Sequence, residues 1–471
     1  MIDALARGDL TEQALARLGE REPRNAVQAL ASAALEPDLR SHLARWAPPL
    51  LVAARPGFGA QALVEIARRY RRTRGKELPP DALASLASVV GNSDFLARLL
   101  QRHPHWCEQL RGDPPDPPSK DPIEPDWTAI RIAKYQGLLR IAARDLADRP
   151  FSQSLSELSE LADRCLAAGL ERAASETRVP APALLALGKL GGCELNFSSD
   201  VDLLFVYAEP PRSEAAERKE GMARLIQLFK RQLEARSEDG LAYRIDLDLR
   251  PEGRSGALAN TVDAALYYYE TFGAEWERQA LIRLRYLAGP RTVAERFTQG
   301  IEPFVFRRGI DIGAVRRVRE MKQRIEQERR AAGRDIECEL KEGPGGIRDV
   351  EFLVQALQLF HGGRLPALRT GNVELALARL AEHGLLPEAA TTLLREAYLW
   401  LRRAEHALQL VEERQTQRFP RDPAAQLGLA RRMGYRDESG ALARDRMLDD
   451  WTRVRAQVRQ HFDNLVLGGD A

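Results

Sequence analysis

Hydrophobic positions recur at helical spacing along most of the chain. After Thr11 and again after Ser93, apolar residues follow at intervals of three and four, so both residues are predicted N-caps of helices. A longer helix is predicted over 214–236, where the apolar positions fall on one face. These positions are Met222, Leu225, Ile226, Phe229 and Leu233. The first 110 residues or so show few strand patterns and are expected to be helical.

The pattern changes in the middle of the chain. Two short apolar runs, 183–188 and 201–207, have the length of buried strands. Residues 241–251 alternate, with Ile245, Leu247 and Leu249 on one face and charged residues between them. Together with the helix over 214–236, these runs predict a small sheet crossed by one helix.

Helical spacing returns from about residue 263 to the end. The segment 393–415 carries apolar residues at alternating intervals of three and four, which is the seam of a helical bundle. The seam residues are Leu394, Ala397, Leu401, Ala404, Leu408 and Val411. Residues 111–127 contain six prolines among short polar residues and predict a linker without helix or central strand.

These patterns predict a mainly helical α+β protein with three parts. Residues 1–125 form a helical region that ends in the proline-rich linker, and residues 126–300 hold the sheet with its leading helices. Residues 301–471 form a C-terminal helical bundle.

Charge and cysteine content exclude several classes of function. The 70 Lys and Arg residues nearly balance the 68 Asp and Glu residues, whereas nucleic-acid-binding domains usually carry a basic excess. The basic segment 314–330 is interleaved with glutamates, so a solvated or docking helix is expected there. The four cysteines form no CxxC pair, which argues against a disulfide framework or a zinc site. With no signal peptide and no membrane-spanning apolar run, a cytoplasmic protein is expected.

Two carboxylates stand at the start of the second apolar run. Asp200 and Asp202 are two positions apart, so on a strand they point the same way with Cα atoms roughly 6.5–7 Å apart. Two bare carboxylates on one face repel each other, and a hard cation such as Mg²⁺ or Mn²⁺ removes the repulsion. Asp246 and Asp248 offer further carboxylates on the alternating segment. Acids on two neighbouring strands are typical of metal-assisted chemistry at phosphorus.

A glycine-rich turn precedes the acids and predicts a phosphate site. Glycines allow backbone N–H groups to approach an anion closely, and hydroxyl and basic side chains add donors. The candidates are Gly191, Gly192, Ser198, Ser199, Lys189 and Arg250. A second glycine pair, Gly345 and Gly346, stands just before a predicted helix with Arg348 in its first turn. This pair is either a second anion site or a tight turn.

The stretches "GKLGGCELNFSSDVDLLFVY" and "SEDGLAYRIDLDLRPEGRSGALAN" resemble the glutamine-synthetase adenylyltransferase/adenylyl-removing family. The resemblance continues through "GAEWERQALIRLR" and "GPGGIRDVEFLVQALQLFHGG" and covers roughly residues 130–466. It implies a polymerase-β-type nucleotidyltransferase domain flanked by helical domains. The family has two catalytic halves. The stretches "GAEWERQALIRLR" and "GPGGIRDVEF" are closer to the half that removes AMP. Whether the chain is a fragment or a one-half protein is left open.

The resemblance also implies roles for particular residues. Asp200, Asp202 and Asp246 match the family's metal-binding and catalytic acids, with Mg²⁺ or Mn²⁺ as the cofactor, while Asp248 stands where the family often has arginine. The implied reaction is phosphorolysis of an adenylylated tyrosine of glutamine synthetase, which gives ADP. The alternatives are AMP transfer from ATP by the same domain, or a non-catalytic scaffold. Implied partners are glutamine synthetase, phosphate or ADP and a PII-type signalling protein, with neither nucleic acid nor membrane.

Overall fold

The computed structural model describes residues 1–17, 22–307, 335–438 and 441–467, together with several positions between 322 and 333. The chain divides into two compact units, neither of which is a continuous segment. Unit 1 comprises Met1–Ser119, Tyr135–Glu157 and Trp400–Val454, and unit 2 comprises Lys120–Lys134, Leu158–Leu399 and Arg455–Ala471. The domain limits predicted from the sequence, near residues 125 and 300, stay predictions.

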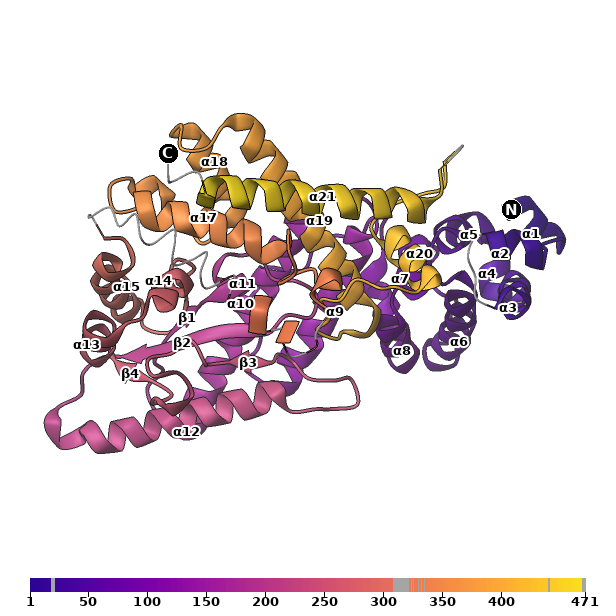
Figure 1. Ribbon diagram of the computed structural model, residues 1–471. Helices are drawn as coiled ribbons and strands as arrows, with labels where there is room; N and C mark the ends of the chain where they lie inside the picture. Colours follow the sequence, from indigo (N-terminus) through magenta and orange to yellow (C-terminus); the bar gives the residue numbers. More distant parts are fainter. Residues whose placement is uncertain are drawn as a thin grey trace. The chain divides into compact units, whose positions relative to one another are not determined.

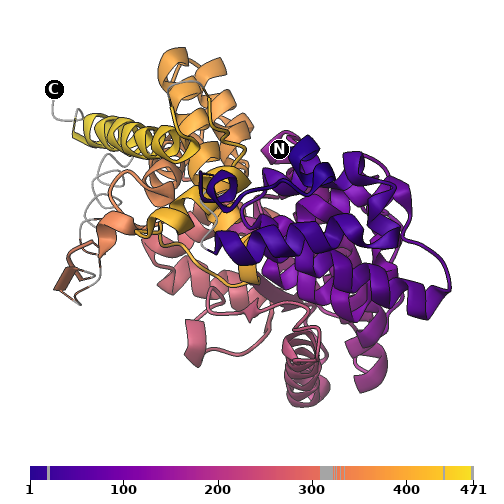
Figure 2. The same cartoon turned by 90° about the vertical axis from the view of Figure 1, so that its right-hand side faces the viewer.

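The regular elements described in unit 1 are helices, joined by loops and by the proline-rich segment. Its N-terminal helices gather in one cluster, drawn in indigo in Figures 1 and 2. They are α1 (Ile2–Arg7), α2 (Glu12–Arg17), α3 (Pro23–Leu35), α4 (Pro37–Arg40), α5 (Leu43–Leu51), α6 (Pro56–Arg74), α7 (Leu83–Asn92) and α8 (Asp94–Arg102). Helices α6 and α7 approach closely at Gly59, where a Cβ atom would lie 2.9 Å from the Cα of Gly91. Only glycine permits such a close approach of two backbones.

The predicted N-caps of unit 1 are confirmed. The Ser93 hydroxyl accepts a hydrogen bond from the Leu96 N–H at 3.1 Å, and the Thr11 hydroxyl accepts one from the Ala14 N–H at 3.2 Å. Four longer helices contribute residues to both units. They are α9 (Trp127–Asp145), α10 (Phe151–Thr177), α19 (Glu388–Glu412) and α21 (Ala443–Leu467). Helix α20 (Pro423–Arg432) belongs to unit 1.

Unit 2 contains a five-stranded mixed sheet. The strands are β1 (Ala183–Ala186), β2 (Val201–Tyr207), β3 (Ile245–Asp246), β4 (Asn260–Thr261) and β5 (Arg285–Ala288). Strand β1 lies between β2 and β5 and is antiparallel to both. Strands β3 and β4 pair with different ends of β2, and both pairs are parallel. Figure 1 shows β2 as the long central strand beside α12.

Helices cover both faces of this sheet. On one face, α13 (Val262–Phe272) and α15 (Arg291–Val305) share a core with side chains of β1 and β2. On the other face, Phe229 of α12 (Ala215–Glu234) makes an edge contact with Phe205 of β2, with ring centroids 5.7 Å apart. All five predicted apolar positions of α12 are buried, as its helical spacing indicates.

The remaining α-helices in the described part of unit 2 are short or lie after the sheet. They are α11 (Gly188–Gly191), α14 (Glu275–Leu281), α17 (Ile347–His361) and α18 (Val373–Glu382). The proline-rich segment 111–126 holds neither a helix nor a strand of a sheet, as predicted. Within the described part of the chain, no helix has the length and apolar character needed to cross a membrane. The mainly helical α+β class is confirmed.

Two predictions of secondary structure are wrong. Strand β5 lies in a segment predicted to be helical, because its pairing with β1 depends on residues a hundred positions away. Strand β3 covers only Ile245 and Asp246, although alternation extends over 241–251. The Asp246 side chain accepts a hydrogen bond from the Asp248 N–H at 2.7 Å, which turns the chain and ends the strand. The basic segment 314–330 lies mostly outside the described residues.

Candidate functional site

The corner between β1 and β2 brings Asp202 against the backbone of α11. Gly188, the first residue of α11, has a φ of +53°. A Cβ atom on Gly188 would lie 2.0 Å from Oδ2 of Asp202, which is far inside van der Waals contact. The Leu187 N–H donates to the Asp202 carbonyl at 2.9 Å and fixes the strand beside this turn. Only glycine fits at position 188, because both its backbone conformation and the neighbouring carboxylate exclude a side chain.

Asp202 and Asp246 are direct neighbours across two parallel strands. They are paired in the register of β2 and β3, and adjacent strands lie about 4.8 Å apart. Asp246 accepts the hydrogen bond from the Asp248 N–H. The Asp202 carboxylate has no hydrogen-bond or ion-pair partner among the residues that the structure describes. The structure thus brings two of the three predicted acids together and leaves one of them without a partner, while their role at the site stays a prediction.

The surroundings of Asp202 disfavour its charge. Burial raises the pKa of Asp202 from 3.8 to about 6, and repulsion from Asp246 and, less strongly, from Asp200 adds to the effect. Lys341 and Lys189 act in the opposite direction. A half-buried carboxylate that is repelled by its neighbours is stabilised by any cation that comes within reach.

Asp200, the third predicted acid, is turned toward an arginine. The Arg244 Nε donates to Asp200 Oδ1 at 2.6 Å, and the same guanidinium donates to the Ser198 carbonyl and hydroxyl at 2.8 and 2.9 Å. Both side chains of the ion pair are about one-third exposed, at 33% and 32%. In the described ranges, no three His, Cys, Asp or Glu side chains lie close enough together to hold a metal ion.

The acids nevertheless fit a divalent cation. Two carboxylates with oxygen donors only, one of them unpartnered, form the kind of donor set that Mg²⁺ and Mn²⁺ prefer. Asp200 can complete the set if it leaves Arg244, because a partly exposed ion pair contributes only about 0–1 kcal/mol. A cation would therefore be held by Asp202 and Asp246, with Asp200 joining them on release.

The predicted phosphate donors near the acids are only partly available. The N–H groups of Gly191 and Gly192 already donate to Leu187 and Gly188 carbonyls, at 2.8 and 3.2 Å. A Cβ atom on Gly191 would lie 1.9 Å from the Arg283 carbonyl, so this glycine serves close packing. Ser199, by contrast, has a buried hydroxyl without a hydrogen-bond partner among the described residues. Ser199 is thus the predicted donor that the structure leaves free for a ligand, and the phosphate roles stay predictions.

Arg250 and Asp248 are engaged in the loop after β3. The Arg250 guanidinium donates to the carbonyls of Leu247, Arg254, Gly256 and Ala257 at 2.8–3.2 Å. Asp248 pairs with Arg254 at 2.7 Å on the surface. Arg250 therefore stabilises the conformation of this loop. Its contact with a phosphate stays a prediction. Asp248 turns away because strand β3 ends before it.

In the second glycine turn, at Gly345 and Gly346, the N–H groups are already hydrogen-bonded within the protein. The Gly345 N–H donates to Asp349 Oδ2 at 2.7 Å, and the Gly346 N–H donates to the Gly343 carbonyl at 3.0 Å. The next two N–H groups of α17 donate to carbonyls of the preceding loop at 2.9 Å. Arg348 pairs with Glu342 at 2.9 Å. The structure favours the tight turn over the anion site, because the donors expected to bind phosphate have partners.

Two basic residues near the acids were not among the predicted site residues. Arg244 precedes Ile245 directly, and its position on the same face as Asp246 was the signal that could have identified it. Lys341 comes from the loop before α17 and acts on the pKa of Asp202. Its distance of 139 positions from Asp202 explains why no local pattern revealed it.

Comparison with known proteins identifies relatives for most of the chain. The family described as glutamate-ammonia ligase adenylyltransferase matches residues 83–300, and the family described as GlnD PII-uridylyltransferase matches residues 316–466. A relative from Stenotrophomonas maltophilia (strain K279a) is 38% identical over 402 residues, which are 80% of this chain and 43% of the relative. A relative from Thioalkalivibrio sulfidiphilus (strain HL-EbGR7) is 38% identical over 354 residues, or 71% of this chain and 36% of the relative.

Both relatives carry the name bifunctional glutamine synthetase adenylyltransferase/adenylyl-removing enzyme. The chain spans less than half the length of each of them, at 43% and 36%. The matched region includes the corner between β1 and β2 and the acids of β2 and β3. The resemblance inferred from the sequence motifs is confirmed, and the chain belongs to the glutamine synthetase adenylyltransferase/adenylyl-removing enzyme family.

Proposed function

We propose that this chain removes AMP from an adenylylated tyrosine of glutamine synthetase by phosphorolysis. The observation that carries the proposal is the pairing of Asp202 with Asp246 across β2 and β3, with the Asp202 carboxylate unpartnered. The names of the relatives support glutamine synthetase as the substrate. A polymerase-β-type nucleotidyltransferase domain, proposed for the sheet and its helices, would place these acids at the reacting phosphorus.

The reaction balances without a covalent enzyme intermediate. An oxygen of hydrogen phosphate bonds to the α-phosphorus, and the bond between that phosphorus and the tyrosine oxygen breaks. The proton of hydrogen phosphate passes to the departing tyrosine oxygen, so the products are ADP and free tyrosine.

Asp202 and Asp246 would hold Mg²⁺ or Mn²⁺, and Asp200 would join them after leaving Arg244. When bound, the cation supplies positive charge beside the phosphate oxygens. The free Ser199 hydroxyl can donate to a phosphate oxygen, and Arg244, once released by Asp200, is a second donor for the same group.

The test is to incubate the 471-residue chain with adenylylated glutamine synthetase, Mg²⁺ and inorganic phosphate, and to measure ADP. Phosphate-dependent ADP formation is expected. A parallel reaction with unmodified glutamine synthetase and ATP tests the opposite direction, the transfer of AMP onto the tyrosine. If only the second reaction proceeds, the chain is an adenylyltransferase; if neither proceeds, a scaffold role replaces the enzymatic proposal.

A PII-type signalling protein is proposed as a regulatory partner. The match of residues 316–466 to the family described as GlnD PII-uridylyltransferase supports this, because that description names a PII protein. Co-elution of the chain with a PII protein in size-exclusion chromatography is the expected result, and separate elution at micromolar concentrations of both would contradict it.

A further inference from the structure

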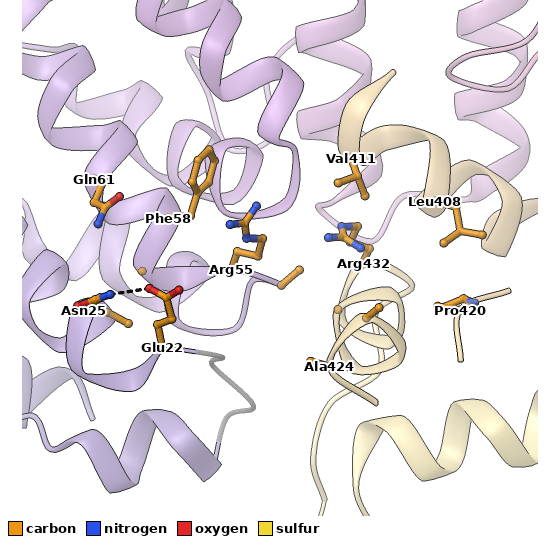
Figure 3. A pocket seen from close by; sticks show the side chains of 15 residues that line it. Glu22, Asn25, Arg55, Phe58, Gln61, Leu408, Val411, Pro420, Ala424 and Arg432 are labelled. Carbon is orange, nitrogen blue, oxygen red and sulfur yellow. Dashed lines mark hydrogen bonds between the residues drawn. The ribbon is translucent and has the colours of Figure 1, made fainter. Parts of the chain in front are cut away.

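Unit 1 contains a cavity of about 530 Å³ that lies entirely among its own residues. One wall comes from the starts of α3 and α6, and the other from the end of α19 and from α20 (Figure 3). This volume is within the range of about 300–1,000 Å³ found for small-molecule sites. The acids of β2 and β3 belong to unit 2, so this cavity is separate from the site described above.

Arg432 lines the cavity as a buried charge with an incomplete set of partners. The residue is 9% exposed, and its Nε donates to the Asn92 carbonyl at 2.9 Å. The two terminal guanidinium nitrogens have no hydrogen-bond or ion-pair partner in the described part of the chain. They lie beside Gly428, where a Cβ atom would be 3.6 and 3.7 Å from them. A buried cation of this kind is costly unless an anion accepts its hydrogen bonds.

Two other charged side chains, Arg55 and Glu22, line the cavity. Arg55 pairs with Asp94 and stacks on the Phe58 ring, with 4.6 Å between the guanidinium carbon and the ring centroid. Glu22 accepts a hydrogen bond from the Asn25 amide at 2.5 Å. Burial lowers the pKa of Arg432 to about 10; the nearby Asp94 carboxylate acts in the opposite direction, and repulsion from Arg55 adds to the lowering. Arg432 is therefore the buried charge at the cavity, whereas Glu22 and Arg55 are exposed to solvent.

Apolar side chains complete the cavity. Leu408 and Val411 of α19 line it together with Pro420, and Figure 3 shows them on the same side as Arg432. The seam of α19 predicted from the sequence is fully buried at Leu401 and Ala404, whereas Leu408 and Val411 are only half-buried. Apolar surface beside a guanidinium group favours a ligand that has both an anionic head and an apolar body.

We propose that this cavity binds a small organic anion, a carboxylate or phosphate monoester joined to a short apolar group. The anionic head pairs with the terminal nitrogens of Arg432, and the apolar body packs against Leu408 and Val411. Arg55 is placed to donate a further hydrogen bond to the head, since only one of its nitrogens is bonded to Asp94. This site does not rest on the proposed phosphorolysis, because none of its residues belongs to unit 2.

Calorimetric titration of the full chain with benzoate and, separately, with phenyl phosphate tests the site. Saturable binding of one molecule per chain is expected for at least one of the two anions, and the comparison shows which head is preferred. Benzyl alcohol, which has the same ring without the charge, is expected to bind at least tenfold more weakly.

Two variants locate the binding. Arg432→Gln removes the charge, and Gly428→Leu fills the wall beside an intact Arg432; each is expected to weaken anion binding at least tenfold. Arg98→Gln, which changes an exposed arginine of the same unit outside the cavity, is the matched control and should leave affinity unchanged. If Arg432→Gln loses its cooperative thermal transition, Gly428→Leu decides.

The site is refuted if neither anion binds saturably, or if both variants bind as the parent does. Asp202→Ala separates this result from the catalytic proposal, because it should abolish ADP formation and leave the anion affinity unchanged.

Discussion

The two glycine turns of unit 2 look alike in sequence and differ in what surrounds them. The turn at Gly188 packs against the unpartnered Asp202 carboxylate, which another carboxylate faces across the sheet. The turn at Gly345 packs against the Arg455 carbonyl, and its N–H donates to Asp349, which is also paired with Lys322 at 2.7 Å. A glycine-rich turn beside an acid is therefore a candidate site only where the acid remains unsatisfied.

The largest effect on the rate of ADP formation is expected from removing the Asp202 carboxylate. Asp202→Ala should lower the rate of ADP formation by about 10²-fold or more, because the variant loses the carboxylate that faces Asp246. Initial rates with adenylylated glutamine synthetase and phosphate measure the effect. Glu238→Ala, which removes an exposed carboxylate of the same unit, is the control and should keep the parent rate. An Asp202→Ala variant that is folded and as active as the parent would overturn the proposed site.

The glycines themselves can be compared by giving each a methyl group. Gly188→Ala and Gly345→Ala both force a positive φ on alanine. Each also places the new methyl carbon about 2 Å from a neighbouring oxygen atom, so each should lower the free energy of unfolding by roughly 1–3 kcal/mol. Only Gly188→Ala should also reduce the rate at a temperature where both variants are folded, because its methyl group displaces the Asp202 carboxylate. Urea unfolding and initial rates separate the two effects. Equal loss of rate in both variants would remove the distinction between the turns.

The charge of Asp202 should make stability depend on pH in a recognisable direction. Its pKa is raised in the folded protein from 3.8 to about 6, so the ionised form destabilises the fold above pH 6, and protonation relieves this between pH 6 and 4. Asp202→Asn should therefore be more stable than the parent by about 1–3 kcal/mol at pH 8, and the difference should vanish near pH 4. Urea midpoints at these two pH values measure it. A difference that grows as the pH falls would show that the pKa is lowered instead.

Arg244 should compete with divalent cations for Asp200. Arg244→Gln is expected to raise the affinity for Mn²⁺ by about three- to fivefold, since the exposed ion pair contributes up to about 1 kcal/mol. Electron paramagnetic resonance of free Mn²⁺ measures this affinity without any enzyme assay. Arg224→Gln, which breaks an exposed ion pair on α12, is the matched control. Weaker Mn²⁺ binding in Arg244→Gln would mean that Arg244 supports the acids rather than occupying one of them.

The smallest effect on the rate is expected from Arg348, beside the turn at Gly345. Arg348→Gln should change the dependence of the rate on phosphate concentration by less than about twofold, because Arg348 is paired with Glu342 and the N–H groups around it already have partners. Rates over a series of phosphate concentrations provide the measurement. A large rise in the phosphate concentration needed for half-maximal rate would restore the second anion site.

Local patterns predicted the elements whose stability is decided locally. The face of α12 and the caps at Thr11 and Ser93 could be read directly, because helical spacing and capping involve residues within a few positions of one another. Strand β5 could not, since its residues become a strand only by pairing with β1. The acids at 202 and 246 were found because each stands at a recognisable strand end. Lys341 was not found, because it reaches Asp202 only through the fold.

Arg244 is a positive charge that the protein itself places beside the acids. Its guanidinium reaches Asp200 and the Ser198 carbonyl, so part of the repulsion among the acids is relieved by the polypeptide alone. The folded sheet therefore does not need a bound cation to offset this part of the repulsion, because a side chain of the protein already does so.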